Sequence, residues 1–172
     1  SITANDLLLA GITGRLETTT VDVVCSNLQN NGAITHNGEC TSLRLAGIVS
    51  YHSAGSFTNC SNSKPISISS TGSVKTNLYL AGLFGGTVTA KTLDECHNTG
   101  TISVNSTFTM TGIAYLSGVA VTVSGKLADV PSVTDCSNRG AISFEGVTNE
   151  THTASSSGNN ERVCLGGVFN GA

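Results

Sequence analysis

The chain has 172 residues, a formal net charge of −3 and only 11% charged residues. It has no basic run of the kind that nucleic acids and anionic membranes attract, and no apolar stretch of about 18 residues that would cross a membrane. Aromatic residues make up 5% and tryptophan is absent, so stacking platforms for sugars or bases are scarce. The hydrophobic residues, 38% of the chain, recur regularly, which indicates an ordered domain.

Two short signatures alternate along the chain, and the first is an apolar run that contains a glycine. It occurs at residues 8–12, 45–48, 80–83, 110–113 and 165–168. We expect its glycine to lie where the backbone bends or packs closely. The signature glycines are Gly11, Gly47, Gly82, Gly112 and Gly167.

The second signature is a cysteine, a Ser or His, and an asparagine, followed by an isoleucine. Its cysteines are Cys25, Cys60, Cys96 and Cys136, and its asparagines are Asn27, Asn62, Asn98 and Asn138. Successive cysteines are 35, 36 and 40 residues apart. A nearly fixed period indicates a repeat architecture. The interval from glycine to cysteine lengthens in the fourth unit, which predicts a loop insertion of about ten residues.

The segments after the signature isoleucine predict short β-strands. Residues 66–69, 102–105 and 142–145 alternate between apolar and polar side chains, a pattern of period two typical of strands with one buried face. Repeated at a fixed period, such strands predict an all-β fold: a right-handed parallel β-helix, or β-solenoid, of about four to five rungs with a repeat of about 35 residues. The single domain, residues 1–172, divides into repeats at about 6–42, 43–77, 78–109, 110–162 and a partial 163–172.

The alternating pattern of apolar-Ala-Gly-apolar and Cys-x-Asn-x-Gly-x-Ile resembles the GLUG-type repeats of bacterial surface proteins. It is similar in particular to β-solenoid adhesin-like proteins of Bacteroidetes. Residues 78–102 and 135–144 match best, and the resemblance extends from about residue 6 to residue 172. It implies a surface-exposed repeat protein involved in attachment, located outside the cell or on its surface.

One cysteine per repeat at one phase predicts a column of sulfur atoms. The column is either a row of buried, reduced thiols or a set of disulfides between rungs, since stacked Cα atoms about 5 Å apart are within disulfide range. A line of sulfurs suits zinc poorly, because zinc prefers a tetrahedron of ligands. The asparagines predict a second column, of stacked turns. Cys40 and Cys164 have no place in either column.

Few residues suggest chemistry. Thr35, Ser67, Ser103 and Ser143 are expected to form an outward row, which is either a simple wet face or a surface for a glycan or ice. Glu95 and Asp135 share a phase and would be the carboxylate pair of a β-helix carbohydrate-active enzyme; we interpret them as a surface pair. We therefore expect no catalytic residue, no cofactor and no metal.

The ends of the sequence suggest the partners. Neither end contains an amphipathic helix that would cap a solenoid, so we expect a partner at the open ends. This partner is either the rest of a longer repeat protein or a second copy stacked end to end. The predicted function is an extracellular structural or adhesive module without catalysis; the alternatives are a filament subunit and the enzyme. Host or surface glycans or proteins would bind at the insertions, residues 118–130 and 146–162.

Overall fold

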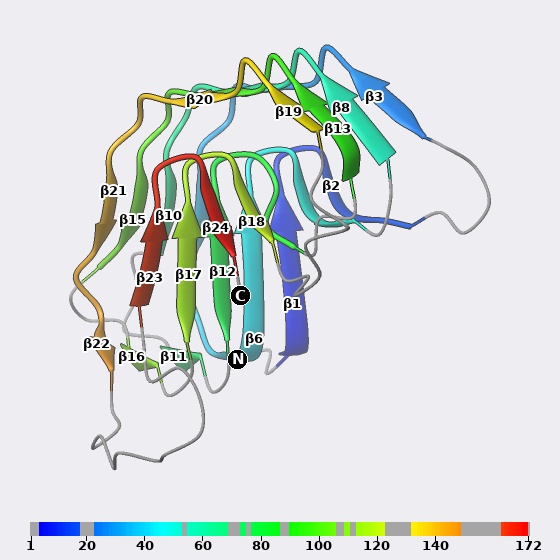
Figure 1. The fold of residues 1–172 in the computed structure, drawn as a ribbon. Helices are drawn as coiled ribbons and strands as arrows, with labels where there is room; N and C mark the ends of the chain where they lie inside the picture. Colours follow the sequence, from blue (N-terminus) through cyan, green and yellow to red (C-terminus); the bar gives the residue numbers. More distant parts are fainter. Residues whose placement is uncertain are drawn as a thin grey trace, which may run out of the picture.

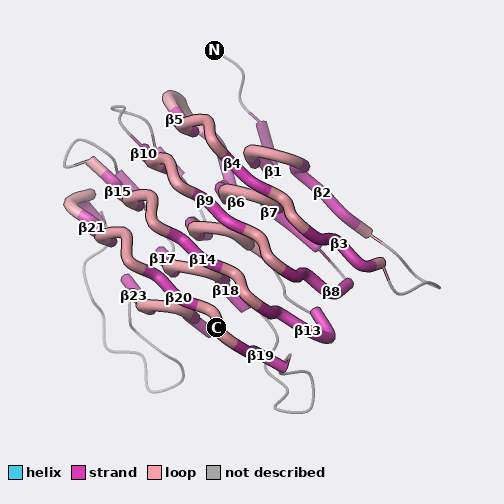
Figure 2. Tube along the Cα trace, turned by 90° about the horizontal axis from the view of Figure 1, so that it is seen from above, coloured by secondary structure: helices cyan, strands magenta, loops and turns pink. Residues whose placement is uncertain are grey.

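Parallel β-strands stacked on one another make up the described fold. The computed structural model describes residues 4–17, 23–52, 55–68, 73–74, 77–86, 90–105, 109–110, 113–122, 132–148 and 163–171. Every strand pairing within these ranges is parallel. The chain winds in coils, each lying on the previous one (Figure 1; Figure 2). The expectation of an all-β solenoid is thus confirmed. None of the described segments is a helix with the length and hydropathy of a membrane span.

Each coil begins with a strand of one long parallel sheet, here called the β6 sheet. Its strands are β1 (Ala4–Ala10), β6 (Cys40–Ala46), β12 (Leu78–Ala81), β17 (Ala114–Ser117) and β23 (Val163–Gly166). The register stacks equivalent residues, so that Leu45, Leu80, Leu116 and Leu165 form one column. Leucine after leucine at this position therefore forms a continuous apolar stripe from coil to coil.

The chain then turns sharply at a glycine and returns along a second wall, here called the β7 wall. This wall consists of β2 (Thr13–Leu16), β7 (Val49–His52), the single bridging residue Phe84, β18 (Ala120–Thr122) and β24 (Phe169–Gly171).

Three further parallel sheets complete each coil except the last described one. The β8 sheet contains β3 (Val24–Ser26), β8 (Gly55–Thr58), β13 (Ala90–Asp94) and β19 (Ser132–Thr134). The β9 sheet contains β4 (Gln29–Asn30), β9 (Ser61–Asn62), β14 (His97–Asn98) and β20 (Ser137–Asn138). The β10 sheet contains β5 (Ile34–His36), β10 (Ile66–Ile68), β15 (Ile102–Val104) and β21 (Ile142–Phe144).

Short strands lead from the β10 sheet to the next coil. They are β11 (Ser73–Val74), β16 (Thr109–Met110) and β22 (Val147–Thr148). Strand β6 is long enough to join this stack, because Cys40 pairs with Val74 while the later residues of β6 pair with β12. Cys40 therefore occupies the buried apolar position that Val74 and Met110 fill in the next coils.

The glycine turn presses into the opposite wall and divides the interior. A Cβ atom on Gly82 would lie 2.0 Å from the Gly118 carbonyl oxygen and 2.5 Å from Cγ of Asn98. Equivalent clashes meet a Cβ on Gly11, Gly47 and Gly118. Since real Cβ atoms do not approach other atoms so closely, only glycine allows the turn to touch the asparagine column of the β9 sheet.

Two apolar cores lie on either side of this contact. One packs the β6 sheet against the β10 sheet, with side chains such as Leu80 and Ile102. The other packs the β7 wall against the β8 sheet, with Phe84, Phe57 and Leu93. The alternating pattern predicted for the β10 sheet places the isoleucines inside and the hydroxyl side chains outside.

The register corrects one glycine and one repeat boundary. The fourth glycine of the column is Gly118, because Ala81 pairs with Ser117; Gly112 lies outside the described residues. Leu43, Leu78, Ala114 and Val163 are equivalent, so the fourth repeat begins near residue 114, not 110. The signature glycine is then 18 residues before Cys136, and the insertion in this interval is about four residues long.

The first repeat needs a second correction. Cys25 pairs with Phe57, so it does not belong to the cysteine column, whose first position is taken by Leu28. The first asparagine of the second column is Asn30, since β4 pairs with β9 through Asn30 and Asn62. Asn27 instead lies beside Asn59 on the outside. The reason is that Ile34 follows Cys25 by nine residues, whereas Ile66 follows Cys60 by six.

Candidate functional site

The outer faces of the β6 sheet and the β7 wall enclose a notch that runs along the stack. The two walls meet at the glycine turn and diverge from it, so their outward side chains face one another. Tyr79 and Tyr115 from the β6 sheet pack with Val121 from the β7 wall. Arg44 from the β6 sheet lies 5.3 Å from the ring centre of Tyr51 on the β7 wall. The notch is thus a surface built by both walls.

An arginine and two tyrosines form a column in the notch. Arg44, Tyr79 and Tyr115 are paired from coil to coil. The rings of Tyr79 and Tyr115 are stacked, with centroids 5.4 Å apart and planes 9° from parallel. The Arg44 guanidinium lies 4.4 Å from the Tyr79 centroid. Stacked rings and a cation on a ring face are both favourable contacts.

Arg44 lies between two aromatic rings and has no anionic partner within the described ranges. Its guanidinium contacts the rings of Tyr51 and Tyr79, at 5.3 and 4.4 Å. Its Nη1 atom is buried and makes no hydrogen bond. Gly86 leaves the room for this atom, because a Cβ there would lie 3.2 Å from it. The positive charge is therefore held by ring faces alone.

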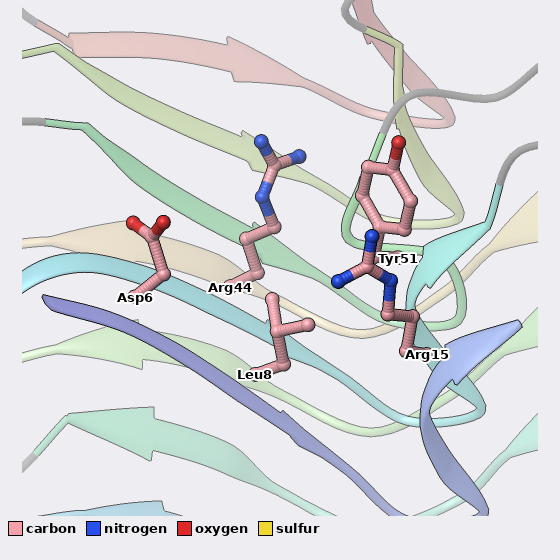
Figure 3. Close-up of a pocket in the computed structure, with 5 residues that line it drawn as sticks. All are labelled: Asp6, Leu8, Arg15, Arg44 and Tyr51. Atoms are coloured by element: carbon pink, nitrogen blue, oxygen red, sulfur yellow. The ribbon is translucent and has the colours of Figure 1, made fainter. Parts of the chain in front are cut away.

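A pocket of about 220 Å³ opens in the notch beside Arg44. It is lined by Asp6, Leu8, Arg15, Arg44 and Tyr51, and Figure 3 shows the carboxylate and the two guanidinium groups around it. Arg15 lies 5.3 Å from the Tyr51 centroid and forms a 2.5 Å ion pair with Glu17. That partner raises the pKa of Arg15. The pocket thus presents two cations, one of them already paired, and one carboxylate.

The positions of the tyrosines in the repeats indicate this site, although the low aromatic content of the chain does not. Aromatic residues are few, but all three tyrosines of the chain, Tyr51, Tyr79 and Tyr115, lie in the notch. Tyr79 and Tyr115 each precede their glycine by three residues, as Arg44 precedes Gly47. Cys164 holds the same place in the last described coil, opposite Tyr115. The residue three positions before the glycine of each repeat, with Gly118 as the fourth glycine, identifies the column of Arg44, Tyr79 and Tyr115 from the sequence.

The cysteine column contains Cys60, Cys96 and Cys136, and none of the six cysteines of the chain forms a disulfide. The hydrogen bond with Cys136 is the largest of the effects that raise the pKa of Cys96. The same contact lowers the pKa of Cys136 to about 7. Burial raises the pKa of Cys25 and Cys40. Of the two forms expected for the column, the structure therefore has the row of small reduced thiols.

The asparagine column is a continuous chain of hydrogen bonds. Asn30 Nδ2 donates to Asn62 Oδ1 at 2.7 Å, Asn62 to Asn98 at 2.8 Å, and Asn98 to Asn138 at 2.7 Å. Each Nδ2 also donates to the carbonyl two residues later, for example Asn98 to Gly100 at 2.8 Å. These side chains lock the turn of each coil to the next.

The remaining polar residues singled out from the sequence lie on the outside. Thr35, Ser67, Ser103 and Ser143 are paired in one row of the β10 sheet. Glu95 and Asp135 are both exposed, at positive φ of 50° and 46°. In the two preceding coils Asn27 and Asn59 take the same left-handed turn, at φ of 59° and 53°. The two carboxylates thus occupy turn positions on adjacent coils.

His52 is a titratable side chain buried without a hydrogen-bond partner among the residues that the structure describes. His52 lies between Phe57 and Phe84, with ring centroids 5.0 and 5.8 Å away. Neither of its ring nitrogens makes a hydrogen bond. Burial lowers its pKa to about 4, so His52 is a neutral core residue at pH 7.

The two insertions lie mainly outside the described residues. Of residues 118–130 the structure describes 118–122, and of 146–162 it describes 146–148. Among the described residues no group of three or more His, Cys, Asp or Glu side chains is placed to hold a metal ion. The chain matches no family model, no curated protein and no solved structure.

Proposed function

We propose that the chain is an extracellular structural and adhesive module of a cell-surface repeat protein. The observation that supports this best is the continuity of its side-chain columns. Glycine, asparagine and leucine columns run from coil to coil and join the described coils into one scaffold. A solenoid of this kind presents extended surfaces that repeat proteins use for binding. The notch is such a surface and contains polar and aromatic side chains from both walls.

The handedness, the number of rungs and the repeat length of the solenoid are part of the same proposal. We propose a right-handed winding, since crossovers between parallel strands are right-handed in almost every known case. We propose about four to five rungs with a repeat of about 35 residues, and a likeness to GLUG-type surface repeats. Each rung would add about 4.8 Å to the length of the stack.

Location and adhesion are tested on cells and on surfaces. Brief protease treatment of intact source cells is expected to release fragments of the protein, as it would any surface protein. Beads coated with the chain are expected to attach to immobilised glycans or matrix proteins under flow, whereas beads coated with heat-unfolded chain do not. Protection from protease until the cells are lysed, or equal attachment by folded and unfolded chain, would contradict the proposal.

A second candidate, a filament subunit that stacks head to tail, is favoured by the outermost described coils. Large apolar side chains whose equivalents in the inner coils are buried are exposed at both: Ile12 is 47% exposed in the first coil, and Val133 and Leu165 are 40% and 56% exposed in the last. A Cβ placed on Gly167 would have no atom within 4 Å, although its counterparts contact the next coil. Such surfaces accept another coil, from a longer chain or from a second copy.

Light scattering and negative-stain microscopy distinguish these two candidates. If copies stack, rods lengthen with protein concentration, and Leu165→Lys shortens them by placing a charge in the contact. If the module is monomeric, mass and length stay constant over micromolar concentrations. Constant mass would exclude the filament and leave the adhesive module.

A further inference from the structure

We propose that the notch pocket binds a sugar acid, with Arg44 as the residue that holds the carboxylate. This inference rests on the proposed adhesive function and names the chemistry of its ligand. The pocket is lined by Asp6, Leu8, Arg15, Arg44 and Tyr51 (Figure 3). None of these residues belonged to a predicted site, and each contributes a different element of recognition.

The charge of Arg44 is not compensated by an anion among the described residues. A guanidinium carries five N–H donors and favours bidentate contact with a carboxylate. Within the described ranges Arg44 has no ion pair, and its Nη1 atom has no hydrogen-bond partner; its guanidinium lies over the rings of Tyr51 and Tyr79. The rings and Gly86 fix the plane and position of the group. Arg44 is therefore a preorganised cation at the wall of an open pocket.

The net charge of the pocket lining matches a ligand with a single negative charge. Arg15 lines the same pocket, but its guanidinium is already paired with Glu17 at 2.5 Å. Asp6 adds a negative charge on the pocket wall. A polyanion such as a phosphate cluster would meet this carboxylate and be repelled, whereas a single carboxylate is matched by the one free arginine. The pocket thus favours a ligand with one negative charge.

Asp6 and Leu8 give the pocket a hydrogen-bond acceptor and an apolar surface. An ionised carboxylate accepts hydrogen bonds and donates none, so Asp6 suits a ligand with hydroxyl groups. Leu8 supplies an apolar surface at the base of the pocket, onto which the C–H face of a sugar ring fits. At about 220 Å³ the pocket is smaller than the roughly 300–1,000 Å³ that drug-sized ligands occupy. One sugar ring that carries a carboxylate and hydroxyls meets all these conditions.

The experiment is a titration of the folded chain, followed by NMR, with three small ligands. Methyl glucuronoside has both the carboxylate and the hydroxyls, methyl glucoside has only the hydroxyls, and glutarate has only carboxylates. The first is expected to bind with a Kd on the order of 1 mM, typical of one small polar ligand. The shifts are expected at Asp6, Arg44 and Tyr51, and the other two ligands should bind at least about tenfold more weakly.

Three substitutions assign the contacts. Arg44→Met keeps a long side chain between the two rings but removes the charge, and is expected to weaken glucuronoside binding at least about tenfold. Asp6→Asn should weaken it less and should reduce the preference over glutarate. Arg139→Met removes an exposed arginine of the β9 sheet instead and should leave binding unchanged. The urea midpoint of each variant shows whether it is folded, and Arg44→Gln, which is also uncharged, replaces Arg44→Met if that variant unfolds.

The outcomes separate this inference from the proposed function. Glutarate binding as tightly as glucuronoside would point to acidic peptide side chains and overturn the sugar assignment. Glucuronoside binding that survives the loss of Arg44 would overturn the site. Absence of binding together with continued attachment of coated beads would refute the inference and leave the adhesive function standing. Loss of both in the folded chain would refute both.

Discussion

A glycine on one wall touches an asparagine on the opposite wall in successive coils. The turn at Gly82 has no space for a Cβ, because the Gly118 carbonyl and Asn98 occupy it. The asparagines in turn hydrogen-bond to one another along the stack. The two residue types that recur in the sequence are thus parts of one contact, which holds the coils together and divides the core.

Gly82→Ala is expected to destabilise the fold by about 3 kcal/mol or more, because the added methyl group would lie 2.0 Å from a backbone oxygen that cannot move alone. Gly167→Ala is the matched control, since nothing lies within 4 Å of its Cβ position. It should change the free energy of unfolding by no more than about 0.5 kcal/mol. Urea unfolding measures both, and equal effects would show that the glycine turn does not press on the next coil.

Asn98→Ala is expected to cost at least about 2 kcal/mol, since it leaves the Asn62 amide and the Asn138 carbonyl oxygen without their partner in a buried place. The exposed Asn31 is the control. It accepts one hydrogen bond from Ser63, at 3.2 Å, and its replacement by alanine should be nearly neutral. If the two variants unfold at the same urea concentration, the asparagine column contributes no stability.

His52 predicts a loss of stability in mild acid. Its pKa falls from 6.5 to about 4 on folding, so between these pH values the unfolded chain binds the proton and the folded chain does not. The contribution of His52 to stability should be constant above about pH 7 and fall by about 3 kcal/mol as the pH drops toward 4. The lowered pKa of His36 acts in the same direction. His52→Leu should reduce the slope of urea midpoint against pH; an unchanged slope would contradict the assignment.

The sequence was enough to predict which residue types recur in the coils, but not which residues they contact. The period of the cysteines and glycines was enough to predict stacked coils, because equivalent residues must recur where rungs repeat. It did not show that glycine and asparagine touch, since they come from opposite sides of a coil. Cys25 and Asn27 were assigned by their local motif, although the distance to Ile34 places Leu28 and Asn30 in those positions.

At the scale of the elements, each strand is stabilised by its equivalents in the neighbouring coils. Strands of two to seven residues would not be stable alone. In the β6 sheet the column of Leu45, Leu80, Leu116 and Leu165 lies on strands that pair on both sides, except at the last described coil. The contribution of a leucine to the free energy of unfolding therefore depends on the position of its coil in the stack.

Leu80→Ala is expected to destabilise the chain by about 2–5 kcal/mol, because Leu80 is fully buried between coils and its removal leaves a cavity. Leu165, in the same column, is 56% exposed, and Leu165→Ala should cost less than about 1 kcal/mol in a monomer. Thermal unfolding at low protein concentration compares the two. A large effect of Leu165→Ala that grows with concentration would indicate that another copy covers the last coil.

The elements also explain why the notch was not predicted. Its residues belong to the two walls before and after the glycine turn. Arg44 and Tyr51 are therefore close in sequence but on different walls. Tyr79 and Tyr115 join them only through the register of the coils. Gly112 was assigned to the glycine signature in place of Gly118, and Tyr115 precedes Gly118, not Gly112, by the three residues that separate Tyr79 from Gly82.

At the scale of the whole molecule, the repeat produces a stack with two cores, an outer row of hydroxyl groups and a notch. The columns connect successive coils, and the departures from the repeat distinguish one coil from another. Arg44 replaces the tyrosine of the following coils, and Asp6 and Arg15 occur in the first described coil. A binding pocket therefore arises at one place along a regular surface, where the repeat is broken.

The stacking of coils is tested most directly by contacts between methyl groups in a selectively labelled chain, measured by NMR. Leu80 lies between Leu45 and Leu116 in the register of the β6 sheet, so its methyl groups should show nuclear Overhauser contacts to both, 35 and 36 residues away. Contacts of Leu80 to these two leucines would establish the parallel in-register stack on which the columns, the notch and its pocket depend. Contacts confined to residues of its own repeat would contradict the β-solenoid.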